Sequence, residues 1–491
     1  MVVATSNEVA TFFVCVGNDY CSVSSGEYPL TCRAMRVLFI LFSMLTVVVG
    51  VTAQPSYLSF EDALSLGMER NPAIVASEYA ERAAHRERQA AIGLFMPKVS
   101  IKGAYTHLDK DIKIDFNPMV SSLAPLLGDV VSSLGLDISY PLQRRNSAFL
   151  GGDVEMPIFA GGKIWTANKA AKVEEERTAE QSRQVRGTLL VEIVERYFGV
   201  ELARRGVAIR KEAVEVVGQH LHDVVLLEKE GMAVESERLY AEYRLAEAER
   251  DLERAKLHLE TAQQALRTTL GKEQEVIPST PIFLLPNIEP LDYFQAMAQL
   301  HNPQLGEVES VRELARMNMR LQQANLFPEV VAMGGMIFCN HQLSSLVPRM
   351  AVGVGLNFNI FDGLRKEYKA SAARLQLRRV EALEHKAKQD VQLLVESLYN
   401  NVQSVLVTVA AVERSERFAE EFLRAKRNAF REGMTTATDV VDATLNLSRA
   451  KLERVQTAYE FDLALARLLE ASGMADAFLQ YLHSKMTQSL F

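Results

Sequence analysis

Large apolar and small or polar residues alternate strictly over residues 350–360. Met350, Val352, Val354, Leu356, Phe358 and Ile360 occupy one set of positions, and Ala351, Gly353, Gly355, Asn357 and Asn359 occupy the other. This period of two predicts a β-strand with one apolar face. Residues 149–159 show the same pattern, with Asp153 and Glu155 opposite the apolar positions. Partner strands are expected over about 99–107 and 330–339.

Long segments of helical composition follow each second strand. Proline is absent between Ile158 and Ile277 and from Arg349 to the C-terminus. Residues 163–230 therefore predict one helix roughly 100 Å long, at a rise of 1.5 Å per residue. Such a helix is too long for a compact domain and is typical of a coiled coil or a tube wall.

The chain contains an internal duplication. Asn71-Pro72 recurs as Asn302-Pro303, 231 positions later, and downstream the offset becomes 202. The pairs at the second offset include Gly161 and Gly363, Tyr197 and Tyr399, Gly231 and Gly433, and Gly271 and Gly473. A constant offset over more than a hundred residues indicates a true repeat, of which the first copy carries an insertion at about 108–147.

The duplication defines the domain organisation. The first repeat is expected over 54–271 and the second over 291–473, with a C-terminal tail at 474–491. Each contains a helical segment, a strand pair, a long helix, a turn at Gly231 or Gly433, and a shorter return helix. Residues 272–290 contain four prolines and predict an extended linker that packs with the chain ends in the equatorial region.

The N-terminal region predicts export. An uncharged apolar run after Arg36 ends at the small-residue site Val51-Thr52-Ala53, which is typical of a signal peptide over 35–53. Residues 1–34 then form an upstream extension. A single membrane anchor is the alternative, for which this segment is slightly short.

Composition excludes several classes of function. The net charge of −8 argues against non-specific nucleic-acid binding, which needs a basic surface. Only Cys339 remains after the leader, so no internal disulfide framework is expected. His220 and His222 point about 200° apart on a helix, which disfavours a shared metal. No catalytic or cofactor motif is present, so we expect neither an enzyme nor a cofactor.

The strands favour a membrane barrel. No stretch after residue 54 is apolar for the eighteen or so residues of a membrane helix, so insertion would require a closed β-barrel. The apolar face would meet lipid, and Asp153, Glu155, Asn357 and Asn359 would face the water-filled lumen. Four strands cannot close a barrel; two chains would supply eight and three chains twelve. The edge of a soluble sandwich is the alternative.

This order of features resembles the TolC family of outer-membrane efflux proteins, over about residues 57–475. The most specific segments are PIFAGGK (157–163), NIFDGLR (359–365) and GMTTATDVVDA (433–443). The resemblance implies a mainly α fold with a small transmembrane β part: a homotrimer with a twelve-stranded barrel, continued by an α-helical barrel across the periplasm of a Gram-negative type cell. It also implies a periplasmic adaptor and an inner-membrane transporter as partners.

The resemblance also implies site residues at the inner end of the tube. Phe430, Asp439 and Asp442 match the positions of the periplasmic aperture, whereas Thr435 stands where the family has an arginine. Asp439 and Asp442 are i, i+3 neighbours, and three copies would favour cations; an ordinary solvated helix face is the alternative. The tips that contact the adaptor are expected at Gly231, Met232, Gly433 and Met434.

The predicted function is therefore a passive duct from periplasm to exterior, in a tripartite efflux or type I secretion system. An exported periplasmic coiled-coil scaffold or adaptor is the alternative, although it would not need alternating strand pairs at matched positions in both repeats. Ducts of this family carry drugs, metal ions and secreted polypeptides, and the sequence does not indicate which of these is the cargo.

Overall fold

The computed structural model describes residues 56–119, 139–342, 347–484 and 488–489. The expected upstream extension, the signal peptide and most of the first-repeat insertion lie outside the described residues. Among the described helices, none is both long enough and apolar enough to cross a membrane.

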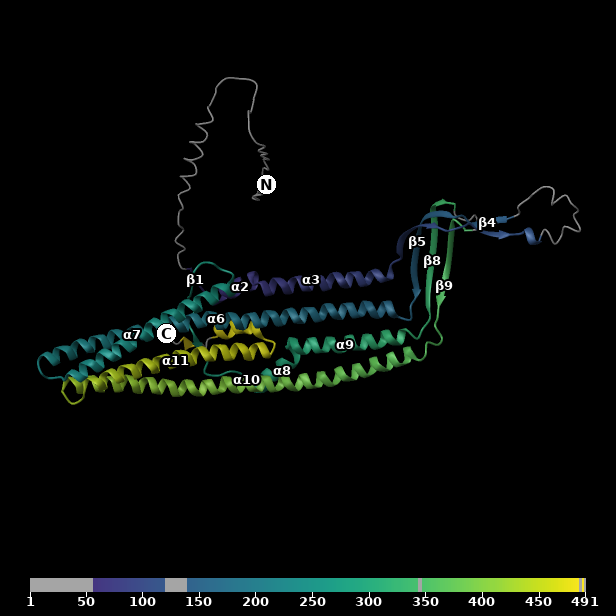
Figure 1. The fold of residues 1–491 in the computed structure, drawn as a ribbon. Helices are drawn as coiled ribbons and strands as arrows, with labels where there is room; N and C mark the ends of the chain where they lie inside the picture. Colours follow the sequence, from purple (N-terminus) through teal and green to yellow (C-terminus); the bar gives the residue numbers. More distant parts are fainter. Residues whose placement is uncertain (1–55, 120–138, 343–346, 485–487, 490–491) are drawn as a thin grey trace, which may run out of the picture. The chain divides into compact units, whose positions relative to one another are not determined.

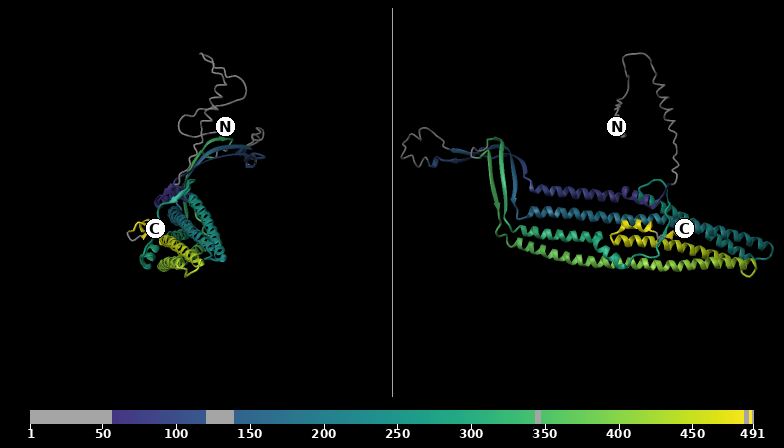
Figure 2. Two further views of the ribbon diagram at one scale, coloured as in Figure 1. Left: turned by 90° about the vertical axis from the view of Figure 1, so that its left-hand side faces the viewer. Right: turned by 180° about the vertical axis from the view of Figure 1, so that it is seen from behind.

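The helices of the two repeats lie side by side, those of the first repeat next to those of the second. They are α2 (Phe60–Arg70), α3 (Pro72–Ile92), α6 (Lys163–Lys229), α7 (Glu235–Leu270), α8 (Leu291–His301), α9 (Pro303–Ala324), α10 (Arg365–Arg431), α11 (Ala437–Ala471) and α12 (Phe478–Leu482), with 3-10 turns η1 (Gly93–Phe95) and η2 (Ala475–Ala477). Nearer the strands the neighbours run α3, α6, α9, α10; toward the other end they run α7, α6, α11, α10. The view from behind in Figure 2 (right) shows the same order. The 67-residue α6 and α10 thus connect both ends.

Glycine ends the long helices where the repeat predicts turns. Gly231 and Gly433 have φ of 72° and 69°, the left-handed region that L side chains rarely adopt. Around each glycine, two backbone bonds close a Schellman motif. At the first turn Met232 N–H donates to the Leu227 carbonyl at 2.8 Å and Gly231 N–H to the Glu228 carbonyl at 3.0 Å. At the second, Met434 N–H donates to the Ala429 carbonyl at 2.8 Å and Gly433 N–H to the Phe430 carbonyl at 3.0 Å. The chain therefore reverses directly into α7 and α11.

The two Asn-Pro steps join the helix segments in the same way in both repeats. Asn71 and Asn302 cap α3 and α9 with their side-chain oxygens, and proline begins each helix. Their amide nitrogens donate to the end of the return helix: Asn71 Nδ2 to the Thr269 carbonyl at 3.2 Å, and Asn302 Nδ2 to the Ala471 carbonyl at 2.7 Å. Each repeat is thus fastened at the level where its return helix ends.

Four strands form one antiparallel sheet in the order β2-β5-β8-β9. They are β2 (Lys98–His107), β5 (Asn146–Phe159), β8 (Glu329–His341) and β9 (Met350–Asn357). Each lies where the alternation predicts a strand, although β9 ends three residues before the expected limit of 360. Part of the first-repeat insertion forms a separate hairpin, β3 (Ile112–Asp115) with β4 (Ser139–Gln143).

The linker between the repeats pairs with both chain ends. Within it, β6 (Val276–Pro278) pairs in parallel with β1 (Ser56–Leu58), and β7 (Phe283–Leu284) pairs with β10 (Gln488–Ser489). Tyr197 fastens this region, because its buried hydroxyl donates to the Leu58 carbonyl at 2.7 Å and accepts from two linker N–H groups. The largest buried side chains gather here: Phe60, Tyr197, Phe198, Phe283, Phe461 and Phe478.

Candidate functional site

The two tips end in a pair of exposed methionines. Met232 and Met434 are 70% and 69% exposed, and each follows the left-handed glycine of its turn. A Cβ added at Gly231 or Gly433 would meet nothing within 4 Å, so both turns are open to solvent in one chain. The four predicted tip residues therefore present two matched apolar points at the same end of the helices.

Asp439 serves the local geometry of the second turn. It is the third residue of α11 and forms a capping box with Thr436, which orders the start of that helix. Thr435, at the position expected for an arginine, donates its hydroxyl to the Asp439 carboxylate, and Lys426 lies 3.6 Å away. The Thr435 hydrogen bond holds the pKa of Asp439 below its usual value. The carboxylate is thus ionised and already partnered.

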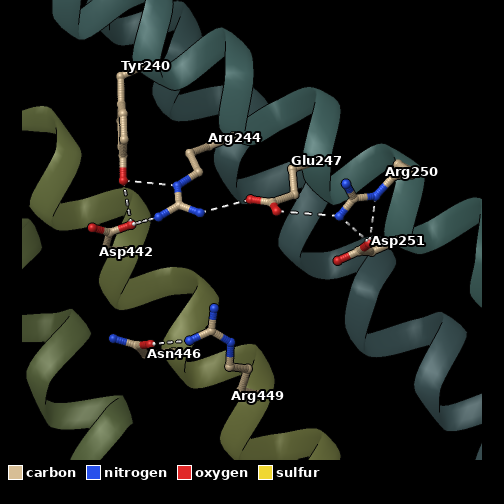
Figure 3. A network of polar contacts seen from close by, with 8 residues as sticks. All are labelled: Tyr240, Arg244, Glu247, Arg250, Asp251, Asp442, Asn446 and Arg449. Carbon is tan, nitrogen blue, oxygen red and sulfur yellow. Dashed lines mark hydrogen bonds and ion pairs between the residues drawn. The ribbon is translucent and has the colours of Figure 1, made fainter.

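Asp442 connects the return helices of the two repeats. Tyr240 donates its hydroxyl to Asp442 Oδ1 at 2.9 Å, and Arg244 Nη2 donates to the same oxygen at 3.0 Å (Figure 3). Arg244 also bonds Glu247 at 2.8 Å, which anchors the guanidinium on α7. The Glu247 hydrogen bond, together with that to Tyr240, raises the pKa of Arg244, so it remains a cation.

Phe430 packs within its own chain. It is half-buried against Val440 and Ala443, and its ring lies 5.0 Å from that of His220. His220 Nε2 donates to the Ala437 carbonyl at 2.9 Å, which joins α6 to the start of α11. The expected aperture aromatic therefore lies in a small core beneath the turn, together with a histidine from the first repeat.

The structure brings the predicted aperture residues to one end but gives them different surroundings. Asp439 bonds within its turn, Asp442 bonds α7, and Phe430 packs against α6 and α11. Sequence reasoning missed Arg244, which supplies a guanidinium from the first repeat although Thr435 replaces the family arginine. The available signal was its position, four residues after Tyr240 on one helix face.

All four strands share one apolar face. Val99 pairs with Val154, Val154 with Gly334, and Gly334 with Val352, so the alternation stays in phase across the sheet between the two register shifts of β5 and β8. The opposite face carries Asp153 and Glu155, which are paired with Gly335 and Met333, and Asn357, which is paired with Glu329. Asp153 accepts a hydrogen bond from Ser100 at 2.7 Å on that face.

Asn359 does not belong to this polar face as a strand residue. The strand β9 ends at Asn357, and the carbonyl of Asn359 accepts a hydrogen bond from Lys366 Nζ at 2.9 Å. The predicted strand limit of 360 is therefore three residues too late, and Asn359 follows the strand. The pairing between β8 and β9 ends with Glu329 and Asn357.

Within the described segments, no three His, Cys, Asp or Glu side chains are grouped as a metal site would require. The geometry instead shows two matched helical hairpins with a polar link at their tips. It also shows an exposed sheet with one apolar face and one mixed face, on which Val331 and Met333 of β8 lie beside the polar residues.

Comparison with known proteins identifies this arrangement. The model of the family described as "Outer membrane efflux protein" matches residues 63–272 and 296–474, which are the two repeats. The chain belongs to this family. Membership places it in the outer membrane with a large periplasmic part, as the sequence predicts, and agrees with the resemblance to TolC.

Individual relatives support the same conclusion. The chain is similar to the outer membrane protein TolC of Vibrio cholerae, with 20% identity over 422 residues that cover 82% of this chain and 88% of the relative. Among solved structures, CusC has a TM-score of 0.70 at 15% identity, covering 87% of this chain and 95% of CusC. The Campylobacter jejuni CmeC outer membrane channel has a TM-score of 0.68 at 13% identity, covering 85% of this chain and 86% of CmeC. These structures show the shared fold.

Proposed function

We propose that three copies of this chain form a passive duct, in which the sheets join into a twelve-stranded barrel and the helices continue as a periplasmic tube. The observation that carries the proposal is the register of the sheet. Its four strands place apolar side chains on one face, and both outer edges are unpaired among the described residues. Unpaired backbone groups in lipid cost several kcal/mol each, so the edges require further copies.

The order of the strands is compatible with closure. Neighbouring strands are antiparallel throughout, so the outer strands β2 and β9 also run in opposite directions. Strand β9 of one copy can therefore continue the antiparallel pattern with β2 of the next. Two copies would leave a bore filled by side chains, whereas three leave room for a channel.

The helical layer also has an exposed apolar edge on each side. Exposed apolar side chains lie on α3 and α7 at one side, such as Tyr79 and Tyr243, and on α10 at the other, such as Leu393 and Val407. Edges of different composition at the two sides fit a head-to-tail ring rather than a two-fold dimer.

Two adjacent residues of β9 test which face meets lipid. Val352 is 76% exposed on the apolar face, and a Cβ at its neighbour Gly353 on the other face meets nothing within 4 Å. We expect Val352→Arg to reduce assembled outer-membrane protein, because an arginine facing lipid near the midplane costs about 2–4 kcal/mol. Gly353→Arg should assemble normally. Equal levels of the two variants would contradict the face assignment.

Mass and fractionation test the assembly. The detergent-solubilised protein should have the mass of three copies by light scattering and should sediment with outer membranes. A protein that stays in solution without detergent would support the periplasmic scaffold instead. A mass of two copies would support an eight-stranded assembly.

The polar link at Asp442 is the proposed fastener of the inner end. It links α7 to α11, so the helical hairpin α6–α7 and the helical hairpin α10–α11 must separate at this contact when the tube opens. Asp442→Asn should weaken the link and increase single-channel conductance in a planar bilayer. Asp251→Asn is the matched control, because the partner of Asp251 among the described residues is Arg250 on its own helix, at 2.9 Å. Unchanged conductance of Asp442→Asn, or an equal increase in both variants, would refute this role.

The exposed methionines support a partner at the tips. In a tripartite system, a periplasmic adaptor would dock there and link the duct to an inner-membrane transporter. The double variant Met232→Glu/Met434→Glu should lose co-purification with the adaptor encoded in the same cell, whereas Met232→Leu/Met434→Leu should retain it. Retention by both variants would place the contact elsewhere.

A further inference from the structure

A basic hollow lies beside the start of α10. It has a volume of about 280 Å³ and lies where α9, α10, β8 and β9 meet, a corner that can be followed in Figure 1. The ionisable side chains that line it are Lys163, Glu329, Asp362, Arg365, Lys366 and Lys369. One water occupies about 30 Å³ of liquid, so the hollow has room for a small hydrated oxyanion.

The charges of the hollow do not balance. Four cations face two carboxylates, an excess of two positive charges (4 − 2 = 2). Both carboxylates are engaged: Glu329 is paired with Lys163, and Asp362 Oδ1 accepts the Arg365 backbone N–H at 3.1 Å. Lys366 donates to a neutral carbonyl. No ion pair among the described residues involves the exposed side chains of Arg365 and Lys369.

The internal repeat shows that helix formation does not require these cations. At the offset of 202, Lys366 corresponds to Ile164 and Lys369 to Ala167, yet α6 begins at the matching position with the same length as α10. Of the four cations, Lys366 and Lys369 therefore have no basic counterpart at the first strand–helix junction, whereas Arg365 corresponds to Lys163. This is a difference between two otherwise matched structures.

The hollow lies on the polar side of the sheet. Its lining includes Asn357 and Glu329, which are paired on the face opposite the apolar one. In the proposed duct this side of the sheet faces the lumen, and the identity inferred for the bound group rests on that proposed function. We propose that the hollow binds an anionic group, phosphate or carboxylate, of a solute that passes from the helical tube into the barrel.

Anion-dependent thermal stability tests the site. The purified full chain in detergent is heated at constant ionic strength while chloride is replaced by inorganic phosphate or, in a second arm, by acetate. A ligand that binds the folded state raises the melting temperature with its concentration. We expect Arg365→Gln/Lys369→Gln to weaken the apparent affinity at least tenfold, and Lys369→Gln alone to weaken it by less.

The matched control is Arg374→Gln/Arg378→Gln, which removes two exposed cations of the same spacing from the same helix outside the hollow. Its affinity should equal that of the unmodified chain. A stabilisation by phosphate alone identifies a phosphoryl group, and one by both anions identifies a small oxyanion in general. The proposal is overturned if neither anion stabilises the protein. It is also overturned if Arg365→Gln/Lys369→Gln leaves the affinity unchanged, or if the control variant reduces the affinity equally.

The outcome is separable from that of the duct. The hollow is built by one chain, so anion binding by a protein that forms no trimer would retain the site and reject the duct. A trimer without any anion effect would reject only the site.

Discussion

The glycines at the ends of the two return helices allow the same substitution, glycine to alanine, to be compared at two equivalent positions. Gly271 and Gly473 are separated by the repeat offset of 202 and have φ of 61° and 71°. A Cβ at Gly473 would lie 2.3 Å from the carbonyl carbon and oxygen of His301 and 2.7 Å from the Asn302 nitrogen. At Gly271 the nearest atom is the Arg70 Cβ, at an ordinary 3.7 Å. Alanine should therefore be far more damaging at 473.

The magnitudes follow from separate contributions. The left-handed conformation costs an alanine about 1–2 kcal/mol at either position. At Gly473 the added methyl group also meets backbone, and the displacement it forces costs about 1–3 kcal/mol, as overpacking does elsewhere. That displacement would loosen the buried bond from Asn302 to Ala471, worth about 1 kcal/mol. Gly473→Ala should thus lose about 3–6 kcal/mol, and Gly271→Ala about 1–2 kcal/mol.

Urea unfolding of the detergent-solubilised protein, followed by far-ultraviolet circular dichroism, measures the difference between the two variants. The urea concentration at which half of the helical signal is lost should be clearly lower for Gly473→Ala than for Gly271→Ala. Equal midpoints would refute the close backbone approach at the second Asn-Pro step. An unstable Gly271→Ala with a normal Gly473→Ala would reverse the assignment.

Three further substitutions have defined outcomes. Leu364→Gly should raise the free energy of unfolding by up to about 1 kcal/mol in the same urea assay, because Leu364 has φ of 64° where the first repeat has glycine. Burial raises the pKa of Asp462, whose Oδ2 accepts a long hydrogen bond of 3.4 Å from the Phe283 N–H. The folded state therefore favours the protonated carboxyl, and the free energy of unfolding should fall as pH rises above about 4. In Asp462→Asn this fall should be absent. Burial lowers the pKa of His220, so acidification below about 6.5 should destabilise the Ala437 end of α11. The hydrogen-exchange protection factors there, corrected for the intrinsic rate at each pH, should fall, and His220→Gln should remove this pH dependence.

The strands and helices were predictable because one physical requirement acts along each of them. A sheet with an apolar face and a polar face needs a period of two, and residues 350–357 show it without exception. The turns at Gly231 and Gly433 were predictable because left-handed backbone favours glycine. The predicted end of β9 is three residues too late, because residues 358–360 continue the alternation beyond the last residue that pairs with β8.

The side-chain contacts at the tip depend on information that a linear pattern does not contain. Whether Phe430 points into the pore or beneath its own turn depends on the rotation of α10 against α6. The bond between Arg244 and Asp442 joins residues 198 positions apart in sequence. Each lies on a helix whose surface offers several charged residues, so periodicity alone cannot select the pair.

The internal repeat itself explains why the link at the tip required divergence. Tyr240 and Asp442 occupy equivalent positions at the offset of 202, and in the structure they contact each other across the two return helices. A perfect duplication would place two identical side chains there. Two aspartates would repel, and two tyrosines would leave Arg244 without its anionic partner on α11. Because one copy has a tyrosine and the other an aspartate at equivalent positions, the two side chains can form a hydrogen bond with each other. That single contact between α7 and α11 is where the two helices are linked at the tip.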